Sequence, residues 1–212
     1  MKITLFCSSS SHPVRAYLDR WMARHQEQHQ IDVVHSNADL TEGDLLFLIS
    51  CSEILTESQR RAYANTLVIH ASDLPLGRGW SPHIWQILGG ATELTLSLME
   101  AENKLDSGAI WKKVLISIDR DALWDEINHK IFEAELGLMD FAVLHCGGMK
   151  ATPQSTEVER TYLAKRTPLD SKIDPQKTIE EQFNLLRVCD PDRFPAYFEL
   201  YGHRYTIRLE KF

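Results

Sequence analysis

Apolar residues recur along this chain in two patterns, short continuous runs and stretches with helical spacing. Residues 2–7 form the first continuous run, which predicts a buried strand. After a serine-rich turn, Val14, Tyr17, Leu18 and Trp21 lie three or four positions apart, which predicts a helix with one apolar face. The next predicted elements are strands at 31–35, 44–50 and 66–70 and a helix at 58–64.

The same patterns continue through the second half of the chain and then change. The predicted elements there are a helix at 81–88, strands at 92–99 and 110–118, and a long helix at 121–146. In the tail, 147–156 are polar and rich in turn formers, 177–188 are amphipathic, and 196–209 predict a hairpin that turns at Gly202-His203. We expect one domain body, 1–150, and a C-terminal elaboration of the same domain, 151–212.

The order of these elements indicates the fold class. Strands that alternate with helices favour parallel pairing through crossover helices. The sequence therefore predicts an α/β fold with a Rossmann-like, mostly parallel sheet flanked by helices. Such sheets bind ligands beyond the carboxyl ends of their strands. We expect the loops at 7–11, 50–53 and 70–75 to meet there.

Composition and charge exclude several classes of protein. A chain of 212 residues with 43% hydrophobic and 25% charged residues is long enough for a packed core and is not disordered in type. Its net charge of −7 shows no basic footprint, so no nucleic-acid partner is expected. No apolar run approaches the roughly 20 residues that span a bilayer, and the first residues are too short a run for a signal peptide. The four scattered cysteines match no zinc spacing, which predicts reduced thiols, no metal site and a cytoplasmic protein.

Most of the candidate chemistry lies between residues 67 and 113. His70, Ser72 and Leu74-Pro75 are followed by Arg78-Gly79 and Pro82, and farther on by Asp106, Gly108 and Ile110. A histidine alone could end a strand, and Asp-Ser-Gly alone could be a turn. Together, and at this spacing, they resemble the folate-dependent formyltransferase family, whose pattern is Asn-x-His-x-Ser-x-Leu-Pro, Arg-Gly-x-x-Pro and Asp-x-Gly-x-Ile.

The resemblance implies that 1–150 is a catalytic domain that transfers a formyl group from 10-formyltetrahydrofolate to a primary amine. His70 would contact the formyl oxygen, and Asp106 would orient His70 and relay a proton. The chemistry requires such groups, because the attack creates an oxyanion and the amine must lose a proton. An aspartate beside a histidine fixes the tautomer and stabilises the imidazolium.

One position departs from the family pattern. Val68 stands where the family has asparagine, and valine cannot donate a side-chain hydrogen bond. Losing one such donor costs on the order of 3 kcal/mol in transition-state stabilisation. Either another donor (Ser50, Ser52 or a backbone amide) replaces it, or the enzyme is slow, or it is inactive. We favour replacement, because His70 and Asp106 are both present.

The resemblance also implies binding residues. The pterin slot of the folate would be formed by two segments, Cys51, Ser52, Glu53, Ile54 and Leu55 with Glu102, Asn103, Lys104 and Leu105. Candidate substrate-binding residues are Ser8, Ser9, Ser10, Ser72, Arg78 and Gly79. The serine cluster could hold a phosphate, or it could be an N-cap without a ligand. Arg78 is either a solvated surface residue or an anion clamp.

The tail indicates a branch of the family. Arg166, Asp170 and Ile173 resemble an element of its tRNA and sugar branches. The tRNA branch carries a further barrel and a basic surface, whereas this chain is acidic and ends at Phe212. We therefore expect a nucleotide-linked amino-deoxysugar as acceptor, nearest to the enzymes of pseudaminic acid pathways for surface glycans. The alternatives are glycinamide ribonucleotide, methionyl-tRNA, and a non-catalytic folate-binding relative. The apolar hairpin could also pair two chains into a homodimer.

Overall fold

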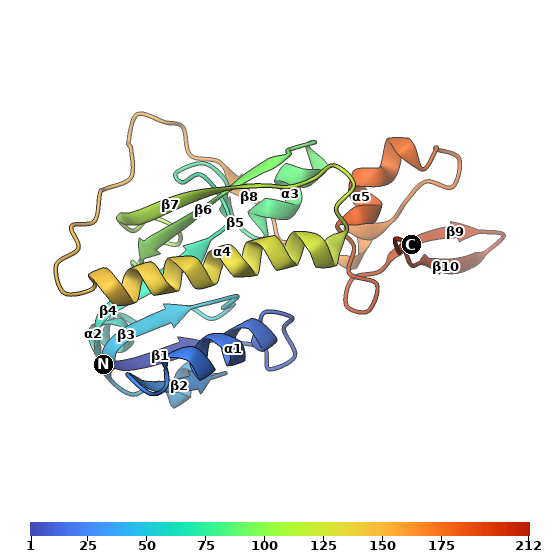
Figure 1. Ribbon diagram of the computed structural model, residues 1–212. Coiled ribbons are helices and arrows are strands. Elements are labelled where there is room, and N and C mark those ends of the chain that lie inside the picture. Colours follow the sequence, from blue (N-terminus) through green and yellow to red (C-terminus); the bar gives the residue numbers. More distant parts are fainter.

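A six-stranded mixed sheet forms the centre of the protein, whose residues 1–212 are all described by a computed structural model (Figure 1). The strand order is β2-β1-β3-β4-β6-β7. The pairs β1–β2, β1–β3 and β3–β4 are parallel, and β4–β6 and β6–β7 are antiparallel. These strands are β1 Lys2–Phe6, β2 Gln30–Val34, β3 Gly43–Leu48, β4 Tyr63–His70, β6 Glu93–Glu100 and β7 Ile110–Ser117. The predicted α/β fold class is thereby confirmed.

Helices and two small strand pairs surround this sheet. The helices are α1 Arg15–His25, α2 Glu57–Arg61, α3 Pro82–Leu88, α4 Trp124–His145 and α5 Phe183–Arg187, with short 3-10 helices at Asn37–Asp39, Pro168–Ser171 and Glu180–Gln182. The small pairs join β5 Arg78–Gly79 to β8 Tyr162–Leu163 in parallel and β9 Ala196–Leu200 to β10 His203–Ile207 in antiparallel.

Several predicted boundaries were wrong by a few residues. The predicted helix 58–64 ends at Arg61, because Tyr63 already pairs with Gly43 in the sheet. The hairpin turns at Tyr201-Gly202, both with positive φ, one residue before the predicted turn. The amphipathic segment 177–188 contains only a 3-10 turn and the short helix α5.

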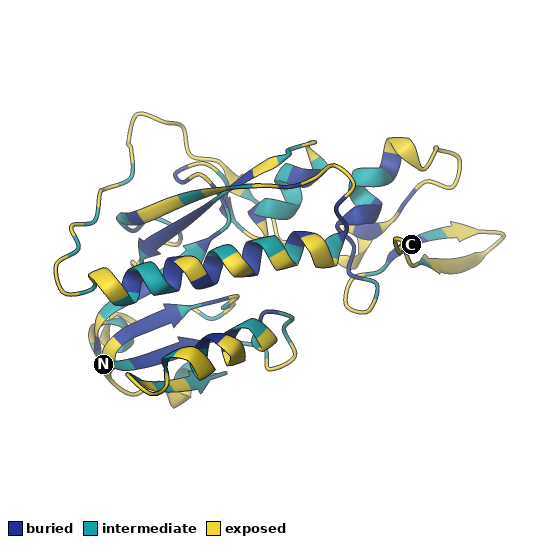
Figure 2. Ribbon diagram, in the orientation of Figure 1, coloured by how far each residue is buried: buried dark blue, intermediate teal, exposed yellow.

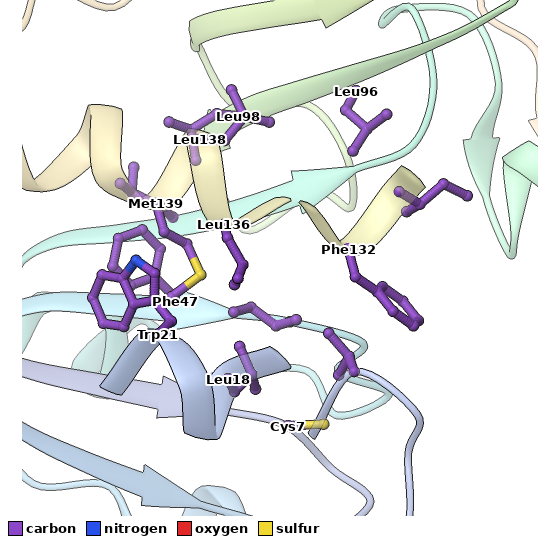
Figure 3. Packing of buried hydrophobic residues seen from close by; sticks show 14 of the residues in the cluster. Cys7, Leu18, Trp21, Phe47, Leu96, Leu98, Phe132, Leu136, Leu138 and Met139 are labelled. Carbon is purple, nitrogen blue, oxygen red and sulfur yellow. The ribbon is translucent and has the colours of Figure 1, made fainter. Parts of the chain in front are cut away.

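The main hydrophobic core lies between the sheet and the helices α1 and α4 (Figure 3). Trp21 of α1 packs edge-on against Phe47 of β3, and Met139 of α4 lies beside both side chains. The predicted apolar face of α1 is correct, since Leu18 and Trp21 are fully buried. On α4 the buried residues face the sheet and the exposed ones face outward (Figure 2). Each such large side chain stabilises the fold by about 1.5–3 kcal/mol through burial.

The C-terminal region has a small core of its own. Ile173, Leu186, Cys189 and Ala196 pack together beneath the hairpin, which projects away from the sheet (Figure 1). The buried guanidinium of Arg187 donates to the carbonyl of Asp119 at 3.0 Å, which ties α5 to the segment before α4. None of the helices combines the length and apolar character that a bilayer-spanning segment needs.

Glu135 on α4 links stability to pH. It is 8% exposed, its Oε2 has no hydrogen-bond partner, and burial raises the pKa of its carboxyl from 4.5 to about 8. Between pH 4.5 and pH 8 the folded chain therefore keeps a proton on Glu135 that the unfolded chain has already released. The contribution of this proton to the free energy of unfolding is full below pH 4.5 and is lost as pH rises toward 8. Over this range the equilibrium constant for unfolding rises by up to tenfold per pH unit.

We expect Glu135→Gln to flatten this slope and to be more stable than the parent chain at pH 8. Urea unfolding at pH 5, 6, 7 and 8 measures the effect. Glu133→Gln, at an exposed position of the same helix, is the matched control and should keep the parent slope. Parallel slopes in the parent chain and Glu135→Gln would contradict the assignment.

Candidate active site

His70 is the last residue of β4, and the sheet holds it in place. Its backbone pairs with Ser97 of β6, and the residue is 8% exposed. The ring atom Nε2 lies 2.9 Å from the carbonyl oxygen of Gly77, in the loop that follows β4. The imidazole is therefore anchored on one side by its own loop.

Asp106 approaches His70 from the connection between β6 and β7. β6 ends at Glu100 opposite Leu67, so this connection leaves the sheet level with the middle of β4 and folds back toward His70. Asp106 adopts a left-handed backbone conformation with φ of +52°. The amide of Gly79 donates to its Oδ2 at 2.8 Å, and its Oδ1 lies 3.8 Å from His70 Nδ1.

The arrangement of acceptors around His70 decides what the pair can do. Nε2 faces the Gly77 carbonyl and Nδ1 faces the Asp106 carboxylate, so only an imidazolium with both nitrogens protonated could donate to both. At 3.8 Å the Nδ1–Oδ1 contact is close but longer than a hydrogen bond. Catalytic hydrogen bonds are often long before substrate binds. Oδ1 of Asp106 thus remains available as a proton acceptor.

Two further histidines, His83 and His12, are uncharged at neutral pH, and nothing in their sequence context marked them. Burial lowers the pKa of His83 on α3 to about 4, and the charge of His70 acts in the same direction. Burial likewise lowers the pKa of His12 to about 4. The ring of His12 meets Phe132 of α4 edge-on at 5.9 Å between centroids.

The two predicted pterin segments are joined by a residue that the sequence did not indicate. Arg60 of α2 donates to the carbonyl of Leu55 at 2.6 Å and to the side chain of Asn103. Ile54 is 67% exposed and Leu105 is 57% exposed, so each segment presents an apolar side chain to solvent. Of the other predicted members, Ser52, Glu102 and Lys104 are exposed, and Cys51 and Glu53 are half-buried.

The predicted substrate residues fall into two groups. Ser8 Oγ accepts from the amide of Ser52 at 2.9 Å, so the first and second loops meet as expected. Ser8 and Ser9 are half-buried and Ser10 is exposed. The serines do not cap α1, because its N-cap is Val14 and no side chain bonds there.

Ser72 and Arg78, in contrast, are buried at about 1% exposure. Arg78 is therefore not a solvated surface residue. Its guanidinium donates to Gln154 and, at 3.4 Å, to Tyr162. Arg78 and Gln154 also line a polar cavity of about 400 Å³ together with Lys104 and Arg160.

Val68 and Ser50 differ in whether their side chains could donate a hydrogen bond to an oxyanion. Val68 is half-buried between Leu48 of β3 and Met99 of β6, on the same strand face as His70 two residues later. Ser50 is exposed, has φ of +49°, and its hydroxyl makes no hydrogen bond. The Ser50 hydroxyl is therefore free to donate.

These features define a class of protein: an α/β fold that carries a histidine–aspartate pair at the end of a central strand. The formyl transferase family model matches residues 1–143, and the chain belongs to this family.

Solved structures share the fold at low identity. Methionyl-tRNA formyltransferase from Clostridium thermocellum has a TM-score of 0.81 and 19% identity, with 96% of this chain and 90% of that chain covered. A sugar N-formyltransferase from a Shewanella species has a TM-score of 0.72 and 15% identity, with 99% and 97% covered. The sugar 3N-formyl transferase WlaRD, solved in the presence of dTDP and 5-N-formyl-THF, has a TM-score of 0.68 and 15% identity, with 89% and 78% covered.

Gly108 allows the connection that carries Asp106 to press against β6. A Cβ at this position would lie 1.8 Å from the carbonyl oxygen of Glu100, which is fixed backbone. We expect Gly108→Ala to destabilise the fold by several kcal/mol or to displace Asp106, because overpacking against backbone is not relieved by side-chain movement. Gly147→Ala is the control, since its Cβ would meet nothing within 4 Å. Urea unfolding of both variants tests this, and equal midpoints would contradict it.

Proposed function

We propose that this chain transfers a formyl group from 10-formyltetrahydrofolate to the primary amine of a nucleotide-linked amino-deoxysugar. One observation carries the proposal. Asp106 has one carboxylate oxygen fixed by the Gly79 amide and the other free, 3.8 Å from His70. A free base beside an imidazole is the arrangement that proton removal from an attacking amine requires.

Asp106 and His70 would have different roles in the reaction. In the overall reaction the amine nitrogen bonds to the formyl carbon, the bond from that carbon to N10 of the folate breaks, and the proton that the amine loses ends on N10. Asp106 Oδ1 would accept the proton from the amine, directly or through water. Nε2 of His70 would exchange the Gly77 carbonyl for the formyl oxygen and donate to it while negative charge develops there, and Asp106 would orient the ring. The Gly79 amide would keep Asp106 from rotating away.

The donor site is supported by the pair of segments that Arg60 joins. Ile54 and Leu105 are exposed apolar side chains on these two segments, and they would contact the faces of a flat pterin ring. The segments fit a folate on these grounds, and 10-formyltetrahydrofolate would supply the formyl group when bound. The presence of 5-N-formyl-THF in the WlaRD structure agrees with this assignment.

The acceptor is proposed from charge and from relatives. A net charge of −7 disfavours a polyanionic tRNA, whose binding depends on basic side chains. Sugar N-formyltransferases are among the structures that share the fold over nearly the whole chain. Within this class we propose an acceptor of the pseudaminic-acid-pathway type, bound with its phosphates toward the serines of the first loop.

We expect His70→Ala and Asp106→Asn each to lower kcat by at least 100-fold, because each removes a group that acts only during transfer. The assay supplies 10-formyltetrahydrofolate with UDP- and dTDP-linked amino sugars, glycinamide ribonucleotide and methionyl-tRNA, and detects products by mass spectrometry. His203→Ala, on the exposed hairpin, should retain full activity. Product with glycinamide ribonucleotide or methionyl-tRNA alone would overturn the proposed acceptor, and tetrahydrofolate binding without any product would support a non-catalytic relative.

A second variant tests the missing asparagine. We expect Val68→Asn to change kcat by less than threefold, because in the proposed site another donor, such as the free Ser50 hydroxyl, would serve the formyl oxygen. The same assay and a thermal melt measure the effect, the melt detecting any loss of packing against Met99. A tenfold or larger gain in kcat would instead show that the oxyanion site is incomplete without asparagine.

A further inference from the structure

Residues 147–163, here called the strap, run from the end of α4 past the start of β7 to the loop that follows β4 (Figure 1). At one end, Thr152 and Ile110 form a two-way backbone bridge at 2.7 and 2.8 Å. At the other end, β8 of the strap pairs with β5, and Thr161 Oγ1 accepts from the amide of Gly77 at 2.7 Å. Hydrogen bonds therefore hold the strap at two places, at the start of β7 and at the loop that follows β4.

Between these two fastenings, the side chain of Gln154 reaches the connection that carries Asp106. Its Nε2 donates to the carbonyl of Asp106 at 3.0 Å and to that of Gly108 at 2.9 Å. Its Oε1 accepts from Nη2 of Arg78. Both N–H groups and the oxygen of the amide are thus used, which fixes the direction in which this side chain points.

Arg78 is the anchor of this arrangement. It is buried and forms no ion pair with any carboxylate, and its two side-chain partners are Gln154 and Tyr162 on the strap. The next residue, Gly79, holds the Asp106 carboxylate through its amide. Asp106 consequently accepts two hydrogen bonds that fix it, one to its carboxylate from the Gly79 amide and one to its backbone carbonyl from Gln154.

The backbone of Asp106 requires such support. A non-glycine residue at positive φ is in a disfavoured conformation that persists only where its surroundings fix it. If the hydrogen bonds from Gln154 were lost, Asp106 could relax to negative φ. Its free Oδ1 would then move away from His70, although no contact of Gln154 involves the carboxylate itself.

We propose that Gln154 is a positioning residue that keeps the Asp106 carboxylate facing His70, with Arg78 as its anchor. The inference rests on the proposed function in assigning a reaction to this pair. It adds a role for the strap, which the sequence presents only as a polar, turn-rich segment.

Two substitutions separate positioning from general stability. Gln154→Glu keeps the oxygen that accepts from Arg78 but loses both donors to the carbonyls, whereas Gln154→Met loses every polar contact at similar size. We expect both to lower kcat by about 10- to 100-fold with less than threefold change in KM, since small displacements of reacting groups cost this much. The melting temperature should fall for Gln154→Met and stay near the parent value for Gln154→Glu. Gln176→Glu, at an exposed position, is the control and should change neither quantity.

Amide hydrogen exchange at Gly79 provides a readout that does not depend on activity. This amide is protected by Asp106 Oδ2, so both Gln154 variants should exchange it at least tenfold faster, while Gln176→Glu should not. If the parent chain shows no turnover with any acceptor, the proposed function fails, and Gly79 exchange still decides the structural role of Gln154. Parent-like kcat together with parent-like Gly79 exchange in Gln154→Glu overturns the inference. So does a loss of kcat in proportion to the loss of melting temperature.

Discussion

The hydrogen bond between the Gly79 amide and Asp106 Oδ2 joins the loop that follows β4 to the connection between β6 and β7. Gly79 belongs to β5, in the loop beyond the carboxyl end of β4, and Asp106 comes from a connection that starts level with the middle of that strand. Without this 2.8 Å contact, nothing in the sheet itself would hold the carboxylate against His70. Gly79 must have φ of +102° to present its amide, and a Cβ there would lie 2.3 Å from the carbonyl of Leu163 on the strap. The position of the Gly79 amide therefore depends on both the loop that follows β4 and the strap.

The change from parallel to antiparallel pairing at β4 makes this meeting possible. A further parallel strand would require a crossover connection, which could not bring a short turn back over β4. Because β6 runs in the opposite direction, its connection to β7 folds directly over the middle of β4, and Ala101 already bonds to the carbonyl of Thr66 at 2.8 Å. This contact restricts the connection, residues 101–109, that carries Asp106. Gly108 shows how tight this fit is, since no side chain can be accommodated against Glu100.

The sequence predicted the parts of this arrangement that depend on local pattern. The apolar runs gave the sheet strands, and the spacing of Leu18 and Trp21 gave the buried face of α1, because both signals follow from backbone periodicity alone. The meeting of His70 and Asp106 was predictable only through family resemblance. Arg60 and Gln154 were missed because each makes its decisive contact, with Asn103 and Asp106 respectively, more than 40 positions away, and neither residue type is unusual in a polar segment. The burial of Arg78 was missed for the same reason, since its partners lie on the strap.

Burial suppresses charge on three other groups of this protein. His12 and His83, with pKa values of about 4, are uncharged at pH 7, and Glu135, with a pKa of about 8, is largely protonated there. Burial is the first cause in all three cases, so an unpaired charge is disfavoured at each of these buried positions. The side chains of His70 and Asp106 are themselves only 10% and 13% exposed, and there an electrostatic contact is stronger than in water, because less solvent screens it. The Asp106 carboxylate and a proton on His70 can therefore act on each other and on a substrate with little competition, provided that the carboxylate is held in place. This makes the backbone contacts of Asp106, rather than any additional charged group, the feature on which the chemistry of the site depends.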